Sequence, residues 1–289
     1  MTSVVNQTLE LVPGRAGFAA EVRGIDLAAV QDETSLHGLR EALAAYGVLS
    51  VPDQKLDAAG LQAFTGRFGD FGHDPFVQPM SGHEHVIEVC RDASETAPIF
   101  GSLWHSDWSF QSEPPAATIL LGAEVPPVGG DTVFANAAAA FDALSPVFQD
   151  MLSRLQAVHT AAPAYGPKGL FSRDDDTRTM DIIVSPEAEN TQTHPIVRSH
   201  PVTGRKALFV NHVYTVGIDG MREQESRALL EFLFKHMTRG EFVHRHRWQA
   251  GTVLMWDNRS VVHYADGGYE GHRRLMYRTT VAGEQPIAA

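Results

Sequence analysis

The chain has 289 residues, 43% of them hydrophobic, which is enough apolar sequence to bury a full core. Its 23 Lys and Arg residues against 35 Asp and Glu residues give a net charge of −12, which argues against nucleic acid as a partner. A single cysteine excludes an intrachain disulfide and a cysteine-rich metal site, and because no secretory leader or membrane-spanning apolar run is apparent, we expect a cytoplasmic protein with no membrane partner.

Four segments show the 3.6-residue apolar spacing of an amphipathic helix. These segments are residues 33–47, 61–68, 136–158 and 222–240. Gly47 and Gly240 suit C-terminal ends. In the third segment Asn136 is a good N-cap, and Pro146 must either begin a second helix or kink the first.

The rest of the chain reads as short strands separated by Gly, Pro, Asp and Asn clusters. The predicted strands are residues 46–51, 85–90, 117–123, 131–136, 206–211, 252–256, 260–264 and 274–281. Regular crossover helices are missing between them, so we expect a mainly β fold, an antiparallel double sheet or barrel with flanking helices. We expect a single domain over 1–289, with mobile lid loops near 76–103 and 162–182, where long loops interrupt the pattern.

The stretch SLWHSDWSF places His105 and Asp107 two residues apart. Residues i and i+2 of an extended chain project from the same face, so both side chains could reach one metal ion. Such a triplet is weak evidence alone, since a surface histidine and a turn aspartate would look the same. It is strengthened by the flanking tryptophans, Trp104 and Trp108, because apolar walls keep a reactive metal away from bulk water.

A second candidate ligand, His263, follows a third tryptophan in WDNRSVVHY. Two histidines and one carboxylate are the facial set that leaves open positions on iron(II), whereas a structural zinc site would use four protein ligands. The sequence therefore favours a catalytic metal centre over a structural one.

The last predicted strand carries Arg274 and Arg278 on one face. Buried arginines need anionic partners, which could be two bound anions or Asp and Glu side chains of the protein. The stretch PPVGGDTVFAN places the hydroxyl of Thr132 after a Gly-rich turn, which by itself is only a turn. Neither GxGxxG, HExxH nor a phosphate-loop lysine occurs in the chain.

These residues resemble the taurine dioxygenase and 2,4-D dioxygenase (TauD/TfdA) family of iron(II)- and 2-oxoglutarate-dependent oxygenases. The resemblance is carried, in collinear order, by AEVRGIDL, YGVLSVPDQ, RFGDFG, WHSDWSF, VGGDTVFAN, HPVTGRKALFVN, RWQAGTVLMWDNRSVVHYA and HRRLMYRTTV. It implies a double-stranded β-helix, the cupin-like jelly roll, with flanking helices. It also implies hydroxylation of a small anionic organic substrate with O2, giving succinate and CO2.

The resemblance implies a role for each candidate residue. His105, Asp107 and His263 would bind Fe(II), and Thr132 and Arg274 would hold the distal carboxylate of 2-oxoglutarate. Arg278 would receive the acidic group of the substrate, and no catalytic side chain beyond the metal ligands is expected. We also expect a homo-oligomer.

The substrate itself is left open. Where taurine-specific members carry a His, a Tyr and an Asn, the counterparts here are Asp74, Val77 and Gly101. A sulfonate, an aryloxyalkanoate, an alkyl sulfate or another small acid would fit. The expected substrate contacts are Arg278, Trp108, Asp74 and Phe76, with Tyr165 and Phe171 as further pocket candidates.

Two other function classes are weighed against the oxygenase. A non-catalytic jelly-roll binding protein would keep the fold but lose a metal ligand, whereas all three candidate ligands are present in this chain. A zinc hydrolase would have no use for Arg274 with Thr132. Eight of the other histidines have no second ligand at useful spacing, and of these His212 lies nearest the substrate side. They are His83, His85, His194, His200, His212, His244, His246 and His272.

Overall fold

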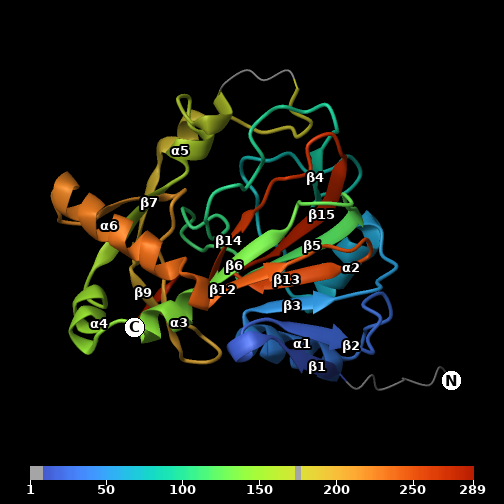
Figure 1. The fold of residues 1–289 in the computed structure, drawn as a ribbon, viewed down its shortest axis with the longest axis horizontal. Coiled ribbons are helices and arrows are strands. Elements are labelled where there is room, and N and C mark those ends of the chain that lie inside the picture. Colours follow the sequence, from blue (N-terminus) through green and yellow to red (C-terminus); the bar gives the residue numbers. More distant parts are fainter. Residues whose placement is uncertain (1–8, 173–176) are drawn as a thin grey trace.

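The computed structural model describes residues 9–172 and 177–289. Its largest sheet has seven strands in the order β1-β2-β3-β13-β5-β15-β4, all antiparallel except the parallel pair β2 and β3 (Figure 1). In chain order these strands are β1 Glu10–Pro13, β2 Ala20–Arg23, β3 Val48–Val51, β4 Ile87–Arg91, β5 Ala117–Glu124, β13 Val253–Asp257 and β15 Arg274–Val281.

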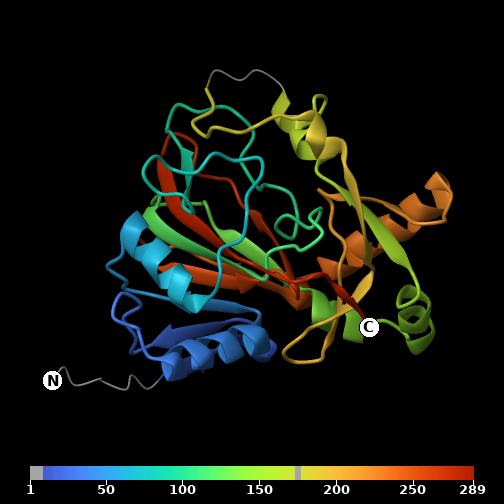
Figure 2. The ribbon, with the colours of Figure 1, turned by 180° about the vertical axis from the view of Figure 1, so that it is seen from behind.

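Two helices cover one face of this sheet, as the reverse view shows (Figure 2). They are α1 Glu33–Tyr46 and α2 Ala58–Phe68. The helix α1 begins where the Asp32 side chain accepts a hydrogen bond from the Ser35 amide. It ends at Gly47, whose φ of 73° lies in the left-handed region that glycine adopts without a Cβ penalty.

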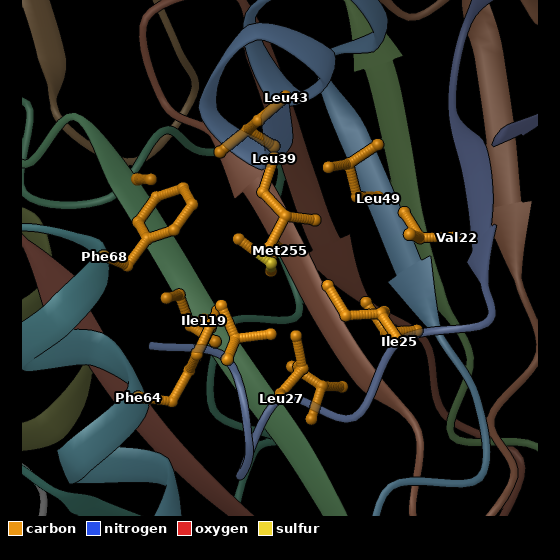
Figure 3. Close-up of a cluster of buried hydrophobic side chains, with 14 of the residues drawn as sticks. Val22, Ile25, Leu27, Leu39, Leu43, Leu49, Phe64, Phe68, Ile119 and Met255 are labelled. Atoms are coloured by element: carbon orange, nitrogen blue, oxygen red, sulfur yellow. The ribbon is translucent and has the colours of Figure 1, made fainter. Parts of the chain in front are cut away.

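The helices α1 and α2 and the sheet enclose a cluster of buried apolar side chains (Figure 3). Leu39, Leu49, Phe64 and Ile119 are fully buried there. We expect Leu39→Ala to lower the free energy of unfolding by about 2–5 kcal/mol, because it removes buried methyl groups and leaves a cavity. Urea denaturation would measure this loss. Val147→Ala, at a side chain that is 81% exposed, should change the free energy by less than about 0.5 kcal/mol.

A second, three-stranded sheet in the order β12-β6-β14 lies over the other face of the large sheet. Its strands are β6 Thr132–Asn136, β12 Val243–His246 and β14 Val261–Ala265. Phe134 and Val261 from this sheet pack against Leu254, Trp256 and Met276 of the large one in a single buried cluster. Two sheets facing each other over a shared core are the predicted double-sheet architecture.

Two further sheets and the other helices build the remaining side of the molecule (Figure 1). The strand orders are β11-β7-β8 and β10-β9-β16. The strands are β7 Gln156–Thr160, β8 Thr191–Pro195, β9 Val197–Ser199, β10 Lys206–Leu208, β11 Thr215–Ile218 and β16 Ile287–Ala288. The helices are α3 Ala137–Asp142, α4 Pro146–Leu152, α5 Ala162–Tyr165 and α6 Glu223–Met237, and the 3-10 turns are η1 Arg15–Gly17, η2 Leu170–Ser172, η3 Pro186–Glu189 and η4 Gly240–Phe242.

Most of the predicted elements are confirmed, with one correction in the segment predicted as helical over 136–158. Pro146 begins a separate helix, α4, one of the two alternatives that its position allowed. Residues 156–158 are not helical, because they begin β7, which pairs with β8 and β11. Part of the predicted loop 162–182 forms α5 and η2, and residues 173–176 lie outside the described residues. No helix in the described part of the chain is long and apolar enough to cross a membrane.

Candidate metal centre and adjoining pockets

Backbone pairing brings together two segments that are distant in the sequence. His105 pairs with His263 of β14 as an isolated antiparallel bridge. The His105 amide donates to the His263 carbonyl over 2.9 Å, and the His263 amide donates to the His105 carbonyl over 2.7 Å. Asp107 follows two residues after His105, so all three side chains reach one place.

The three side chains form a buried cluster that could hold a metal ion. One ligand atom from each of His105, Asp107 and His263 lies within 4.8 Å of the others, and no second such group exists in the described residues. The Nε2 atom of His105 is 3.6 Å from Asp107 Oδ1, and that of His263 is 3.9 Å from Asp107 Oδ2. The Nδ1 atom of His105 lies 2.7 Å from the Leu103 carbonyl, which keeps the proton on Nδ1 and leaves the Nε2 lone pair facing Asp107.

Electrostatics favour the metal-binding protonation states of this cluster. Burial lowers the pKa of His263 to about 3, helped by neighbouring His105, so the imidazole is neutral. Burial works against the Asp107 carboxylate, but Arg278 and the two imidazoles outweigh it and hold the pKa of Asp107 well below its usual range. Two imidazole nitrogens and one carboxylate are a donor set that suits iron(II) and related divalent metals.

A small cavity of about 50 Å³ adjoins the three side chains, and the predicted co-substrate residues, Thr132 and Arg274, line it. The Thr132 hydroxyl accepts a hydrogen bond from Trp248 Nε1 over 2.9 Å, so its own proton is available to an acceptor. Arg274 is buried, its Nε atom has no hydrogen-bond partner, and no carboxylate among the described residues pairs with it. Burial lowers the pKa of Arg274, as expected for a guanidinium that lacks its anion.

Arg278 differs from Arg274 because the protein supplies it with carboxylates. Its NH2 atom lies 3.3 Å from Asp107 Oδ1 and 3.4 Å from Asp74 Oδ1. Burial alone would lower the pKa of Arg278, but Asp107 and Asp74 reverse the shift and raise it. The guanidinium also lies 4.9 Å above the Trp108 ring, and its Nε atom has no partner. Of the two alternatives for these arginines, protein carboxylates therefore hold for Arg278 and not for Arg274.

Asp74 lies behind Arg278 and Trp108, away from the open pocket. Its carboxylate accepts hydrogen bonds from Trp108 Nε1, Arg278 and the Thr280 hydroxyl. Burial raises the pKa of Asp74, although the charge of Arg278 opposes the shift. Trp108 itself has a φ of 46°, a strained conformation for a non-glycine residue and one that is held by these contacts.

A larger pocket of about 180 Å³ opens beside the metal candidates and is mainly apolar. Its lining includes the predicted Trp108, Tyr165, Phe171 and His212, together with Arg278. Residues that the sequence did not point to also line it, namely Ile99, Phe100, Leu103, Leu170, Val213 and Tyr214. Proximity to His212 in the chain was the only local signal for Val213 and Tyr214.

Phe76 does not line this pocket. Its ring stacks on Tyr165, with centroids 5.0 Å apart, so it supports the pocket wall from behind. Several of the other histidines have structural partners instead of a metal. His200 bonds to Asp257 over 2.9 Å and His194 to the Gln111 carbonyl over 2.8 Å, while His244 and His246 line a separate hollow.

Comparison with known proteins identifies close relatives. The family model described as taurine catabolism dioxygenase TauD, TfdA family matches residues 8–280. An alkylsulfatase of Acinetobacter baylyi is 32% identical over 294 aligned positions, which cover 100% of this chain and 90% of the relative. The alpha-ketoglutarate-dependent 2,4-dichlorophenoxyacetate dioxygenase of Cupriavidus pinatubonensis is 33% identical, with 93% and 96% covered.

Solved structures agree with the fold over nearly the whole chain. A taurine dioxygenase from Burkholderia xenovorans superposes with a TM-score of 0.80 at 32% identity, covering 97% of this chain and 93% of that one. AAD-2, solved in complex with Mn(II) and N-oxalylglycine, superposes with a TM-score of 0.77 at 29% identity, covering 97% and 99%. The expected jelly roll is thereby confirmed.

Proposed function

Because this chain belongs to the TauD/TfdA family of 2-oxoglutarate-dependent dioxygenases, we propose that it uses iron(II), O2 and 2-oxoglutarate to hydroxylate a small anionic organic substrate. One observation carries the proposal furthest. A buried arginine without a protein anion, Arg274, shares a cavity with the buried cluster of His105, Asp107 and His263. An anionic co-substrate that also contacts a metal would satisfy both features.

His105, Asp107 and His263 are the proposed iron ligands. Iron(II) bound there would supply the oxidative chemistry, coupling decarboxylation of 2-oxoglutarate to succinate and CO2 with hydroxylation of a substrate carbon. Trp108 and Trp256 are buried and line the two pockets, so they would restrict access of bulk water to the site, whereas Trp104 packs on Tyr264 and lines neither pocket. The protein side chains bind, orient and shield, and none is proposed to form a bond with the substrate.

Arg274 and Thr132 are the proposed partners of the distal carboxylate of 2-oxoglutarate. A guanidinium can donate two parallel hydrogen bonds to a carboxylate, and the Thr132 hydroxyl can add a third. The anion would also remove the electrostatic cost of burying Arg274 alone. Both residues line the cavity that reaches the iron candidates, which suits a molecule that binds at both ends.

Arg278 and the apolar pocket beside it are the proposed substrate site. The pocket of about 180 Å³ offers one guanidinium and mostly apolar walls, so it suits an anion with an alkyl or aryl body. The alkylsulfatase and the 2,4-dichlorophenoxyacetate dioxygenase among the relatives are named for substrates of that kind. We propose that Trp108 contacts the substrate, whereas Asp74 and Phe76 act from behind the pocket wall.

The segments near 76–103 and 162–182 are proposed to cover the substrate. Ile99, Phe100 and Leu103 come from the first segment, and Leu170 and Phe171 come from the second. The rings of Phe100 and Phe171 stack with centroids 5.8 Å apart, so the two segments meet over the pocket. Movement of these segments during turnover stays a prediction.

Anaerobic reconstitution tests the proposal directly. The protein would be mixed with iron(II) and 2-oxoglutarate and examined for a weak visible charge-transfer band, then given oxygen and a panel of alkyl sulfates, sulfonates and aryloxyacids while succinate is measured. A band, with succinate stimulated by one panel member, would support the reaction and identify the substrate class. Absence of the band would contradict the proposal and favour a non-catalytic binding protein.

Arg278→Gln should reduce kcat/KM for the best panel member by about 10²-fold, because a buried charged contact to the substrate anion is lost. Steady-state succinate formation at several substrate concentrations measures this. The KM for 2-oxoglutarate should stay within about threefold of wild type. Arg273→Gln is the matched control, since Arg273 is half-buried, lines neither pocket and pairs with Asp92 and Glu124. Equal kinetics for Arg278→Gln and wild type would rule out Arg278 as the substrate anchor.

A further inference from the structure

The Asp107 carboxylate accepts a hydrogen bond from a threonine that lines neither of the two pockets at the site. Thr118 on β5 is fully buried, and its hydroxyl donates to Asp107 Oδ2 over 2.6 Å. The short distance is typical of a hydroxyl that donates to an ionised carboxylate. Thr118 therefore contacts the carboxylate itself on the side away from the pockets.

The direction of this hydrogen bond is determined by the residues behind it. The indole Nε1 of Trp256 can only donate, and it lies 3.0 Å from Asn258 Oδ1. The amide of Asn258 is thereby oriented, and its Nδ2 atom donates to the Thr118 hydroxyl oxygen over 2.9 Å. With that oxygen already accepting, the Thr118 proton points to Asp107, which as a carboxylate can only accept.

The same asparagine also holds the backbone around Asp107. The Asp107 amide donates to Asn258 Oδ1 over 3.4 Å, and the Ser106 hydroxyl donates to the Asn258 carbonyl over 2.8 Å. Asn258 thus contacts both the backbone of the ligand segment and, through Thr118, the ligand side chain.

The turn that carries Asn258 is itself strongly braced. The preceding residue, Asp257, is fully buried and accepts hydrogen bonds from the Arg259 side chain over 2.8 and 2.6 Å. His200 Nε2 lies 2.9 Å from the same carboxylate. These contacts hold the turn in one conformation, so the hydrogen bonds that Asn258 makes to the Asp107 segment have defined directions.

We infer that Thr118 and Asn258 are positioning residues that orient the Asp107 carboxylate for the metal ion. The inference rests on the proposed role of Asp107 as a ligand. A carboxylate that is free to rotate must lose that freedom when a metal binds, whereas one held by Thr118 has already lost it. The hydroxyl of Thr118 and its orientation by Asn258 therefore contribute to metal affinity.

Thr118→Val tests the inference, because valine keeps the shape of threonine and removes the hydroxyl. Binding of Mn(II) to the metal-free protein would be followed by the electron paramagnetic resonance signal of the free ion, without turnover. We expect the dissociation constant to rise about 10–100-fold, the range that loss of a hydrogen bond to a metal ligand usually produces. Thr118→Ser, which restores the hydroxyl, should bind within about threefold of wild type.

Thr65→Val is the matched control. Thr65 is also fully buried, and its hydroxyl bonds to that of Thr279 over 2.7 Å on the α2 side of the sheet. The Thr65→Val protein should lose about as much folding stability as Thr118→Val and keep wild-type affinity for Mn(II). If Thr118→Val does not fold, Thr118→Ala gives the same comparison without the added methyl group.

Three results would overturn the inference alone, and a fourth would overturn it together with the proposed metal centre. Wild-type affinity in the hydroxyl-free variants would show that Thr118 does not position the ligand, and an equal loss in Thr65→Val would assign the effect to stability. Failure of Thr118→Ser to restore binding would show that packing, and not the hydroxyl, matters. Absence of Mn(II) binding in wild type would instead overturn the proposed metal centre, and the inference with it.

Discussion

Replacing His263 with alanine should remove metal binding and, with it, substrate-dependent succinate formation. In the described part of the chain His263 supplies one of the three clustered candidate donor atoms, and the other two come from a single short segment. Its backbone also pairs with His105, but alanine keeps that pairing, so the change is confined to the imidazole. Since loss of a hydrogen bond to a ligand already costs 10–100-fold in affinity, loss of the ligand itself should cost more than about 10²-fold.

Mn(II) titration and the visible band with iron(II) and 2-oxoglutarate would both report this loss. His244→Ala is the control, because His244 lies on β12 of the same small sheet and faces a different hollow. That variant should bind metal like wild type. A His263→Ala protein that binds Mn(II) as tightly as wild type would show that His263 is not a ligand and would place the metal elsewhere.

Elements with a strong local pattern were predictable from the sequence. The strand β15 begins and ends where the alternation predicts, at residues 274 and 281, because each alternate side chain faces a core. The helix α1 likewise spans 33–46 and ends at Gly47. In contrast, 156–158 continue an apolar pattern that fits a helix or a strand, and pairing with β8 and β11 decides for the strand.

Short strands at sheet edges were not predictable. The strand β12 carries alternating histidines and an arginine, with no buried side chain, and β16 has two exposed residues. Such segments become strands because a neighbour offers backbone hydrogen bonds, and this information does not lie in their own sequence. The strands β1, β2, β7, β8, β9 and β11 were also not predicted, and each of them likewise pairs with a neighbouring strand.

The chemistry of the site was easier to recognise than its geometry. The spacing of His105 and Asp107 and the nearby tryptophans indicated a metal site, but the pairing of His105 with His263 spans more than half the chain. Local patterns carry no information on such a contact, so the nearby tryptophan made His263 only a candidate, and its role as a ligand was implied by the family resemblance. The pocket residue Tyr214 and the support residues Thr118 and Asn258 had no local signal of function and required the structure.

The sequence also treated Arg274 and Arg278 as equivalents, two arginines on one strand face that each required an anion. The two arginines differ in the structure. Asp74 and Asp107 pair with Arg278, whereas no carboxylate in the described part of the chain pairs with Arg274. Asp74 is far from both arginines in sequence, and its contact depends on how the loop after α2 folds back. This difference makes Arg274 the more sensitive probe of the co-substrate.

Arg274→Met should abolish the stabilisation of the protein by 2-oxoglutarate while leaving the free protein at least as stable as wild type. In wild type a buried guanidinium has no counter-charge until an anion binds, which is costly. Methionine fills much of the same space without that cost. In wild type, 2-oxoglutarate at 100 times its Kd should add about 2.7 kcal/mol to the free energy of unfolding.

Thermal unfolding under anaerobic conditions with Mn(II), with and without 2-oxoglutarate, would separate the two effects. We expect a rise in Tm for wild type and for Arg273→Met, since Arg273 is half-buried, pairs with Asp92 and Glu124 and does not line the cavity. Arg274→Met should show no rise, and its apparent KM for 2-oxoglutarate should increase by about 10²-fold or more. A strong rise in Arg274→Met would mean that another group holds the distal carboxylate. A marked loss of stability in the free variant would mean that groups of the protein already compensate the charge of Arg274, so that no bound anion is needed.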